Sequence, residues 1–181
     1  EWTKLPSVSL GELTLGVIGV GNVGSAVVRR ARAFGMRLLG TDVRPLDPAL
    51  LASTGLVPVP LEDLLSESDV VSVNCDLNPT SRGLVDAGVL ARMRPTAFLV
   101  NTARGPIVDE EALVDALRRG VIAGAALDVF EREPLPEDSP LRSMDNVFLA
   151  PHNSNSSPRA WERVHESTFR NLVEALEGSA P

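Results

Sequence analysis

The sequence predicts an α/β protein built on a doubly wound parallel sheet of about seven strands, with helices on both faces. Short apolar runs alternate with helical patterns from one end of the chain to the other, which is the order that parallel sheets require. Most of these runs lack polar alternation, as expected of strands buried on both faces. A glycine-rich turn follows the first run, at a point where such sheets commonly bind a ligand.

Seven apolar runs predict the strands, and capping signals predict several of the helices between them. The strands are expected at residues 15–20, 36–41, 57–59, 70–74, 97–102, 124–129 and 147–150. Asp109 precedes an amphipathic segment that Gly120 ends, and Ser157 with Pro158 begins the last helix. The helix after the first strand has helical spacing at Val23, Val27, Ala31 and Phe34. The last helix carries an apolar stripe of Trp161, Val164, Thr168, Leu172 and Leu176.

Composition excludes several classes of function. Of the 181 residues, 44% are hydrophobic and 23% are charged, which is ordinary for a globular protein with a sizeable core. No apolar run approaches the length of about 18 residues that a membrane-spanning helix needs. The net charge of −7 argues against nucleic-acid binding. Cys75 is the single cysteine, which excludes an internal disulfide framework and favours a cytoplasmic setting.

The stretch GVGNVG at residues 19–24 has the G-x-G-x-x-G pattern of dinucleotide-binding loops. The pattern alone is weak, but here a buried strand precedes it and a helix is predicted to begin at Asn22. Gly19 then allows the tight turn, Gly21 lets the backbone approach a pyrophosphate, and Gly24 permits close helix–strand packing. The N–H groups of the first helical turn, which includes Asn22 and Val23, would face the phosphates. Together these features predict a Rossmann-type cofactor site.

Asp42 ends the second predicted strand, 18 residues after Gly24. An acidic residue at this point accepts hydrogen bonds from the ribose hydroxyls and repels a 2′-phosphate, so Asp42 favours NAD over NADP. Arg44 lies two residues later and argues the other way, because arginine accommodates a 2′-phosphate. The alternative to a cofactor site is a glycine turn beside a solvated aspartate.

Polar residues also follow the other predicted strands, at the edge where open α/β sheets bind their ligands. A simpler role is open for each, since Cys75 more often only packs and Arg104 could solvate the start of a helix. Metal binding by His152 is disfavoured because no second His or Cys lies at ligand spacing. Spacing alone does not choose among the glutamates of the long loop at 130–146. The residues in question are Asn74, Cys75, Asp76, Thr102, Ala103, Arg104, Asp128 and His152.

Three blocks, VNTARGPIVDEEALVDAL, GAALDVFEREPL and NVFLAPH, follow the glycine loop in this order. They resemble the D-isomer-specific 2-hydroxyacid dehydrogenase family, which has phosphoglycerate, D-lactate and hydroxypyruvate/glyoxylate members. The resemblance covers nearly the whole chain and implies the NAD-binding domain of a phosphoglycerate dehydrogenase-like enzyme. Such an enzyme transfers a hydride between NAD(H) and a 2-hydroxy or 2-oxo acid, and it is expected to be a homodimer.

The resemblance also implies roles for individual residues. Arg104 is expected to hold the substrate carboxylate through two parallel hydrogen bonds and to polarise the reacting carbonyl. His152 is expected to supply the proton, and Glu133, which precedes Pro134, to raise the pKa of that imidazole. Asp128 is expected to bind the nicotinamide carboxamide. The residues expected to border the cofactor are Gly19, Gly21, Asn22, Val23, Gly24, Asp42, Cys75, Thr102, Ala103, Arg104, Asp128 and His152.

On this basis residues 1–151 are expected to form the NAD-binding domain, with residues 1–9 as a leading linker. Residues 152–181 would carry the catalytic histidine loop and a helix that leads back to a substrate domain missing from this chain. The chain starts with Glu1 rather than Met, and such a piece is expected to bind cofactor but turn over little substrate.

Two alternatives stay open at this point. NADH-sensing corepressors share this fold and keep the same catalytic residue types, and a nucleotide-binding module without catalysis is the simplest possibility. Two departures from the family pattern also leave the substrate undecided. Asn74-Cys75-Asp76 replaces the usual His-x-Pro, and the run Asn153-Ser154-Asn155-Ser156 replaces a Gly-rich or aliphatic stretch after the histidine.

Overall fold

The computed structural model describes residues 7–154 and 156–178. The chain divides into two compact units, Glu1–Pro151 and His152–Pro181. Most of the expected leading linker, residues 1–6, lies outside the described residues, and the chain then forms a short 3-10 helix at Leu10–Glu12. The first unit contains the sheet and five of the described α-helices, and the second contains α6 (Pro158–Leu176).

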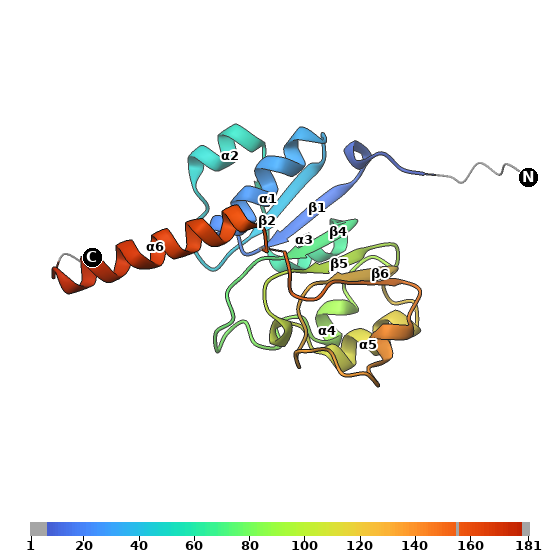
Figure 1. Cartoon of the computed structure of the whole chain (residues 1–181). Helices are drawn as coiled ribbons and strands as arrows, with labels where there is room; N and C mark the ends of the chain where they lie inside the picture. Colours follow the sequence, from blue (N-terminus) through green and yellow to red (C-terminus); the bar gives the residue numbers. More distant parts are fainter. Residues whose placement is uncertain (1–6, 155, 179–181) are drawn as a thin grey trace, which may run out of the picture. The chain divides into compact units, whose positions relative to one another are not determined.

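The first unit is built on one seven-stranded sheet in which all neighbouring strands are parallel, as the sequence predicts (Figure 1). Each predicted strand is confirmed to within two residues at either end. The spatial order is β3-β2-β1-β4-β5-β6-β7. The bounds are β1 (Thr14–Ile18), β2 (Arg37–Thr41), β3 (Val57–Pro58), β4 (Val70–Val73), β5 (Phe98–Asn101), β6 (Gly124–Leu127) and β7 (Val147–Leu149).

The chain reverses its direction across the sheet between β1 and β4, which are neighbours in space but not in sequence. From β1 the chain adds β2 and then β3 toward one edge of the sheet, and from β4 it adds β5, β6 and β7 toward the other edge. The loops after β1 and β4 therefore leave in opposite directions and open a crevice at their carboxyl ends, the place where such sheets bind ligands.

Helices cover both faces of the sheet and form two hydrophobic cores. On one face α1 (Asn22–Ala33) and α2 (Pro48–Thr54) pack on β1 and β2, with Val17, Val28 and Leu50 fully buried. The other face is covered by α3 (Leu61–Glu67), α4 (Ala87–Leu90) and α5 (Glu110–Arg118). Figure 1 shows α1 and α2 on the opposite side of the sheet from α4 and α5.

The buried face of α1 is rotated from the one that the apolar spacing indicates. Of the predicted stripe, Ala31 is buried as expected, but Val23 and the C-cap residue Phe34 are each 60% exposed. The helix also buries Gly24 and Val28. Gly24 faces β1 at close range: a Cβ at this position would overlap the Gly19 carbonyl and lie 3.2 Å from Val17 Cγ1. Close approach at a glycine thus outweighs the burial of larger side chains.

The strands β5 and β7 are not buried on both faces, contrary to expectation. Phe98 on β5 is 50% exposed and Phe148 on β7 is 72% exposed. The reason lies in the connections, because the helices α4 and α5, between β4 and β6, pack on the same face as α3. Among the described residues of the first unit, no helix therefore covers the face shared by α1 and α2 over this half of the sheet.

The capping signals are confirmed. Asp109 accepts a hydrogen bond from Ala112 N–H at the start of α5, and Ser157 accepts one from Ala160 N–H at the start of α6. In the second unit the apolar residues of the predicted stripe on α6 are exposed: Trp161, at 51%, Val164, Leu172 and Leu176. Among the described helices, none is long and apolar enough to cross a membrane.

We predict that Leu64→Ala lowers the free energy of unfolding by about 2–5 kcal/mol, because the substitution leaves a cavity under the sheet. Leu64 is fully buried, and its Cδ2 lies 2.6 Å from where a Cβ on Gly16 would be. Urea denaturation followed by circular dichroism measures the change. The control is Val43→Ala, at a side chain 96% exposed, which should change stability by less than about 0.5 kcal/mol. Equal stabilities of the two variants would contradict the prediction.

Candidate functional site

The glycine loop connects β1 to α1 in a conformation that only glycine suits. Gly19 has a φ of +85°, and a Cβ there would lie 2.5 Å from the backbone N of Cys75. The Gly19 N–H donates to the Thr41 carbonyl at 2.9 Å, which ties the loop to β2. At Gly21, the N-cap of α1, the nearest atom to a Cβ would be 3.8 Å away. The protein therefore leaves no room for a side chain at Gly19 or Gly24, whereas there is space beside Gly21.

The carboxylate of Asp42 is fixed at the end of β2 by two backbone N–H groups. Its Oδ2 accepts from Val20 at 2.8 Å, and its Oδ1 accepts from Arg44 at 3.0 Å. Burial by itself would raise the pKa of Asp42, but these hydrogen bonds and the nearby guanidinium of Arg44 outweigh it. The pKa therefore lies below its usual value, and the side chain is a carboxylate at neutral pH.

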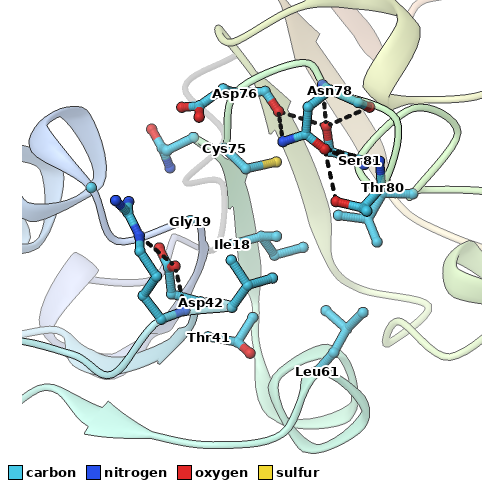
Figure 2. A pocket seen from close by; sticks show the side chains of 15 residues that line it. Ile18, Gly19, Thr41, Asp42, Leu61, Cys75, Asp76, Asn78, Thr80 and Ser81 are labelled. Carbon is cyan, nitrogen blue, oxygen red and sulfur yellow. Dashed lines mark hydrogen bonds and ion pairs between the residues drawn. The ribbon is translucent and has the colours of Figure 1, made fainter.

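A pocket of about 520 Å³ lies at the carboxyl ends of β1, β2 and β4 (Figure 2). Four of the predicted cofactor residues line it: Gly19, Gly21, Asp42 and Cys75. The Cys75 thiol is half-buried, and burial, followed by the charges of Asp76 and Asp42, raises its pKa. A thiol that stays protonated agrees with a packing role rather than a nucleophilic one.

Several lining residues of this pocket were not among those singled out from the sequence. Leu61 and Leu84 contribute apolar surface, and Thr80 and Ser81 come from the loop after β4. Ser81 Oγ donates to the Asp76 carbonyl at 2.5 Å, which closes this loop on itself beside the pocket. Leu61 begins α3 and the others lie in the loop after β4, and none belongs to a recognisable motif, so only the tertiary structure identifies them.

Asn74 is a further lining residue with an unusual hydrogen-bond state. Its Nδ2 donates to the carbonyl and the hydroxyl of Ser72, at 3.1 and 3.0 Å, which fixes the orientation of the amide. Its Oδ1 is buried and has no hydrogen-bond partner among the described residues. A buried acceptor without a partner is costly, so a donor from a bound molecule would be favourable there.

The segment Thr102–Arg104 follows β5 and is shaped by Asn101, whose role the sequence did not indicate. Asn101 is only 1% exposed. Its Nδ2 donates to the Arg104 carbonyl at 3.0 Å, and its Oδ1 accepts from Ala103 N–H at 3.1 Å. Its own carbonyl accepts from Asp128 N–H at 3.0 Å. One buried amide therefore sets the backbone that carries Arg104 and links it to the end of β6.

Gly105 brings two predicted catalytic segments together. A Cβ on Gly105 would overlap the Phe130 carbonyl and lie 2.5 Å from the backbone N of Glu131. The Arg104 segment therefore packs directly on the backbone of the loop that carries Glu133. Glu133 Oε1 in turn accepts from Phe130 N–H at 3.1 Å, so its side chain is held against its own loop.

The predicted site residues thus fall into groups within the structure. Asn22, Val23 and Gly24 form the first turn of α1. Thr102, Ala103, Arg104, Asp128 and Glu133 follow β5 and β6 at the same edge of the sheet but do not line the pocket. His152 is the first residue of the second unit and has a φ of +52°, the only positive value for a non-glycine residue in the described ranges. Such backbone conformations cluster at functional sites.

Two carboxylates lie beside the Glu133 loop in a reciprocal arrangement. Glu131 accepts from Glu110 N–H, and Glu110 accepts from Glu131 N–H, both at 3.2 Å. Burial, followed by the charge of Glu131, raises the pKa of Glu110, although the hydrogen bond from Glu131 opposes this. The pair fastens the loop to the first turn of α5.

We predict that Glu110→Gln changes how stability depends on pH. A carboxyl whose pKa is raised by folding stabilises the folded state while it is protonated, and this contribution disappears as the pH rises through the raised pKa. As the pH rises from about 4 to about 7, through and above the usual range of carboxyl pKa values, the native protein should therefore lose unfolding free energy relative to Glu110→Gln.

Urea denaturation at a series of pH values measures this difference. Glu111→Gln is the matched control, because it removes the same charge from the exposed neighbouring position of α5. A difference between native protein and Glu110→Gln that stays constant over the pH range, or that Glu111→Gln reproduces, would contradict the prediction.

Comparison with known proteins places this geometry in a family. Residues 1–154 match the family model described as D-isomer specific 2-hydroxyacid dehydrogenase, NAD binding domain. A glyoxylate reductase of Korarchaeum cryptofilum is 46% identical over 169 residues, which are 93% of this chain and 50% of that protein. The chain spans about half the length of the curated relatives it matches.

Solved structures agree. A D-isomer specific 2-hydroxyacid dehydrogenase from Xanthobacter autotrophicus, in complex with NADPH and MES, has a TM-score of 0.87 and 36% identity over 99% of this chain and 73% of its own. The D-lactate dehydrogenase of Aquifex aeolicus, with NAD and lactic acid, has a TM-score of 0.86 and 32% identity over 99% of this chain and 58% of its own. None of these three proteins is a corepressor, so that alternative gains no specific support. The chain belongs to the D-isomer specific 2-hydroxyacid dehydrogenases and forms their NAD-binding domain.

Proposed function

We propose that the whole protein reduces a 2-oxo acid with NADH, and that glyoxylate or hydroxypyruvate is its substrate. The observation that carries this proposal is the packing of Gly105 on the Phe130–Glu131 backbone, which joins the Arg104 and Glu133 segments beside the cofactor pocket. The relatives named glyoxylate reductase support the choice of substrate. A phosphoglycerate-type substrate is the second candidate, on the resemblance alone.

The residues of the pocket fit a dinucleotide. Gly21 leaves the space that a pyrophosphate needs, and the first turn of α1 offers N–H groups without acceptors in the helix. The ionised Asp42 suits the ribose hydroxyls. The pocket volume of about 520 Å³ lies in the range of small-molecule sites. When bound, NADH supplies the hydride.

The catalytic roles that we propose rest on side-chain chemistry. Arg104 would bind the planar carboxylate of the substrate through two parallel hydrogen bonds, and Asn101 would hold the backbone that presents it. His152 would donate a proton to the carbonyl oxygen, since an imidazole titrates near neutral pH. Glu133 would favour the protonated imidazole, and Asp128 would bind the nicotinamide carboxamide. The last two assignments are supported by the resemblance.

We also propose that the whole protein is a cytoplasmic homodimer. The family resemblance supports the dimer, and the single cysteine of this chain supports a reducing compartment. Analytical ultracentrifugation of the full-length protein tests the dimer, which a monomeric mass at micromolar concentration would contradict.

Two glycine substitutions should separate cofactor binding from folding. Gly24→Ala is expected to lower the free energy of unfolding by about 1–3 kcal/mol, because the new methyl group overlaps the Gly19 carbonyl. Gly21→Ala is expected to leave stability nearly unchanged, because the nearest atom is 3.8 Å away, but to weaken NADH binding at least about tenfold.

Urea denaturation and titration of NADH fluorescence measure these two effects on the chain itself. Ala substitution at Gly88, whose Cβ would meet only the Asp86 side chain outside the pocket, serves as the binding control. Unchanged NADH affinity in Gly21→Ala would show that the loop does not hold the pyrophosphate.

The proposed reaction predicts the behaviour of two variants of the full-length protein. His152→Gln should lower kcat by about 10²- to 10⁴-fold, because the proton donor is lost. Arg104→Lys should raise KM for the oxo acid, because a lysine cannot form the bidentate contact. Arg92→Lys, in a surface ion pair with Glu62, is the matched control and should change neither constant.

The measurement is the oxidation of NADH, followed by the loss of its absorbance at about 340 nm, with glyoxylate, hydroxypyruvate, pyruvate or phosphohydroxypyruvate as the oxo acid. The proposal fails if the native protein binds NADH but oxidises it with none of these acids.

A further inference from the structure

The loop that carries Glu133 is joined to the start of α5 by two hydrogen bonds between Glu110 and Glu131. Each carboxylate accepts from the backbone N–H of the other residue, and both N···O distances are 3.2 Å. The two residues lie 21 positions apart in the chain, so the contact connects two segments that are distant in sequence. The function proposed above gives neither residue a task.

The α5 side of this contact rests on a fixed backbone. Asp109 caps the helix by accepting from Ala112 N–H at 2.9 Å, and Asp109 N–H donates to the Val85 carbonyl at 3.0 Å. Val85 N–H in turn donates to the Ile107 carbonyl at 3.0 Å, and both of these side chains are fully buried. Glu110 therefore projects from a backbone that is held both by the helix cap and by the core.

The loop side has no comparable support from the core. Phe130 and Leu135 are buried, but the residues between them, 131–134, are exposed. Glu133 Oε1 accepts from Phe130 N–H at 3.1 Å, so Glu133 and Glu131 belong to one short turn. The position of Glu133 therefore depends on polar and backbone contacts, among them the exchange with Glu110.

Position matters for the role that we propose for Glu133. The effect of a carboxylate on the pKa of an imidazole falls as the distance between the two groups grows. A loop that samples several positions would weaken that effect, and a catalytic group that is held loosely loses much of its contribution to the rate. Neither Glu110 nor Glu131 lines the cofactor pocket. A contact that fixes the loop should therefore act on the reaction without touching the cofactor.

We propose that Glu110 and Glu131 are positioning residues for the reaction, and that their reciprocal hydrogen bonds keep Glu133 in the place from which it acts on His152. Both residues act as hydrogen-bond acceptors rather than through their charges. A carboxylate oxygen and an amide oxygen can accept the same hydrogen bond, so a glutamine suffices at position 110. This inference rests on the proposed function, from which it takes the role of Glu133.

The test measures kcat and its pH dependence in the full-length protein, with NADH and the oxo acid that the native protein reduces fastest. Glu110→Ala should lower kcat about tenfold, because Glu131 N–H loses its acceptor and the loop is no longer fixed. Reduction needs the protonated imidazole, so the pH above which activity is lost should fall by about half a unit or more. NADH affinity, measured by nicotinamide fluorescence, should change by less than about twofold.

Three further variants separate positioning from charge and from folding. Glu110→Gln should keep the native kcat to within about twofold and the native pH dependence, since its amide oxygen still accepts from Glu131 N–H. Glu111→Ala is the matched control and should change neither quantity, because it removes the same charge from the exposed neighbouring position of α5. Glu131→Ala breaks the other half of the exchange and provides a second test in case Glu110→Ala folds poorly. Combining Glu110→Ala with Glu131→Ala should be about as harmful as either change alone, because the pair acts as one unit.

Three results would overturn the inference. One is native kcat and native pH dependence in both Glu110→Ala and Glu131→Ala. Another is a lower kcat with unchanged pH dependence, which would place the effect elsewhere than at Glu133. The third is a Glu110→Gln variant as slow as Glu110→Ala, which would show that the charge acts and not the hydrogen bond. Any of these results with an active native protein leaves the proposed function standing. A native protein that oxidises NADH with no oxo acid would instead refute the proposed function, and this inference with it.

Discussion

The contact between Gly24 and the Gly19 carbonyl is the constraint on which the cofactor side of the molecule depends. With no side chain at Gly24, α1 approaches the end of β1 closely enough to put its N-terminus at the reversal point of the sheet. The same loop presents Val20 N–H to Asp42, so the position of the acidic residue is coupled to the glycine turn. The proposed phosphate-binding turn and the proposed ribose-binding carboxylate thus depend on one backbone conformation.

A second close contact organises the other half of the edge. Gly105 packs on the backbone of Phe130 and Glu131, and Asn101 holds the intervening turn through its buried amide. Arginine and glutamate side chains are long and flexible, so their directions depend on the backbone that carries them. Fixing that backbone lowers the entropy lost when a substrate orders the side chains. The reciprocal contact of Glu110 and Glu131 adds a further tie to α5.

The two halves of this edge hold different groups of predicted site residues. The pocket lies at the ends of β1, β2 and β4, whereas the residues proposed to hold the nicotinamide and the substrate follow β5 and β6. The strand β4 lies between them, and its loop departs from the family pattern at Asn74-Cys75-Asp76.

The sequence by itself determined the seven strands, the parallel sheet, the glycine loop and Asp42, because apolar runs and glycine spacing are local signals. It did not determine which side of α1 is buried, since a glycine contact with β1 outweighs the larger apolar residues. It also gave no sign of the open sheet face at Phe98 and Phe148. Only the tertiary structure decided these points, together with the role of Asn101, because each depends on contacts that local sequence patterns do not reveal.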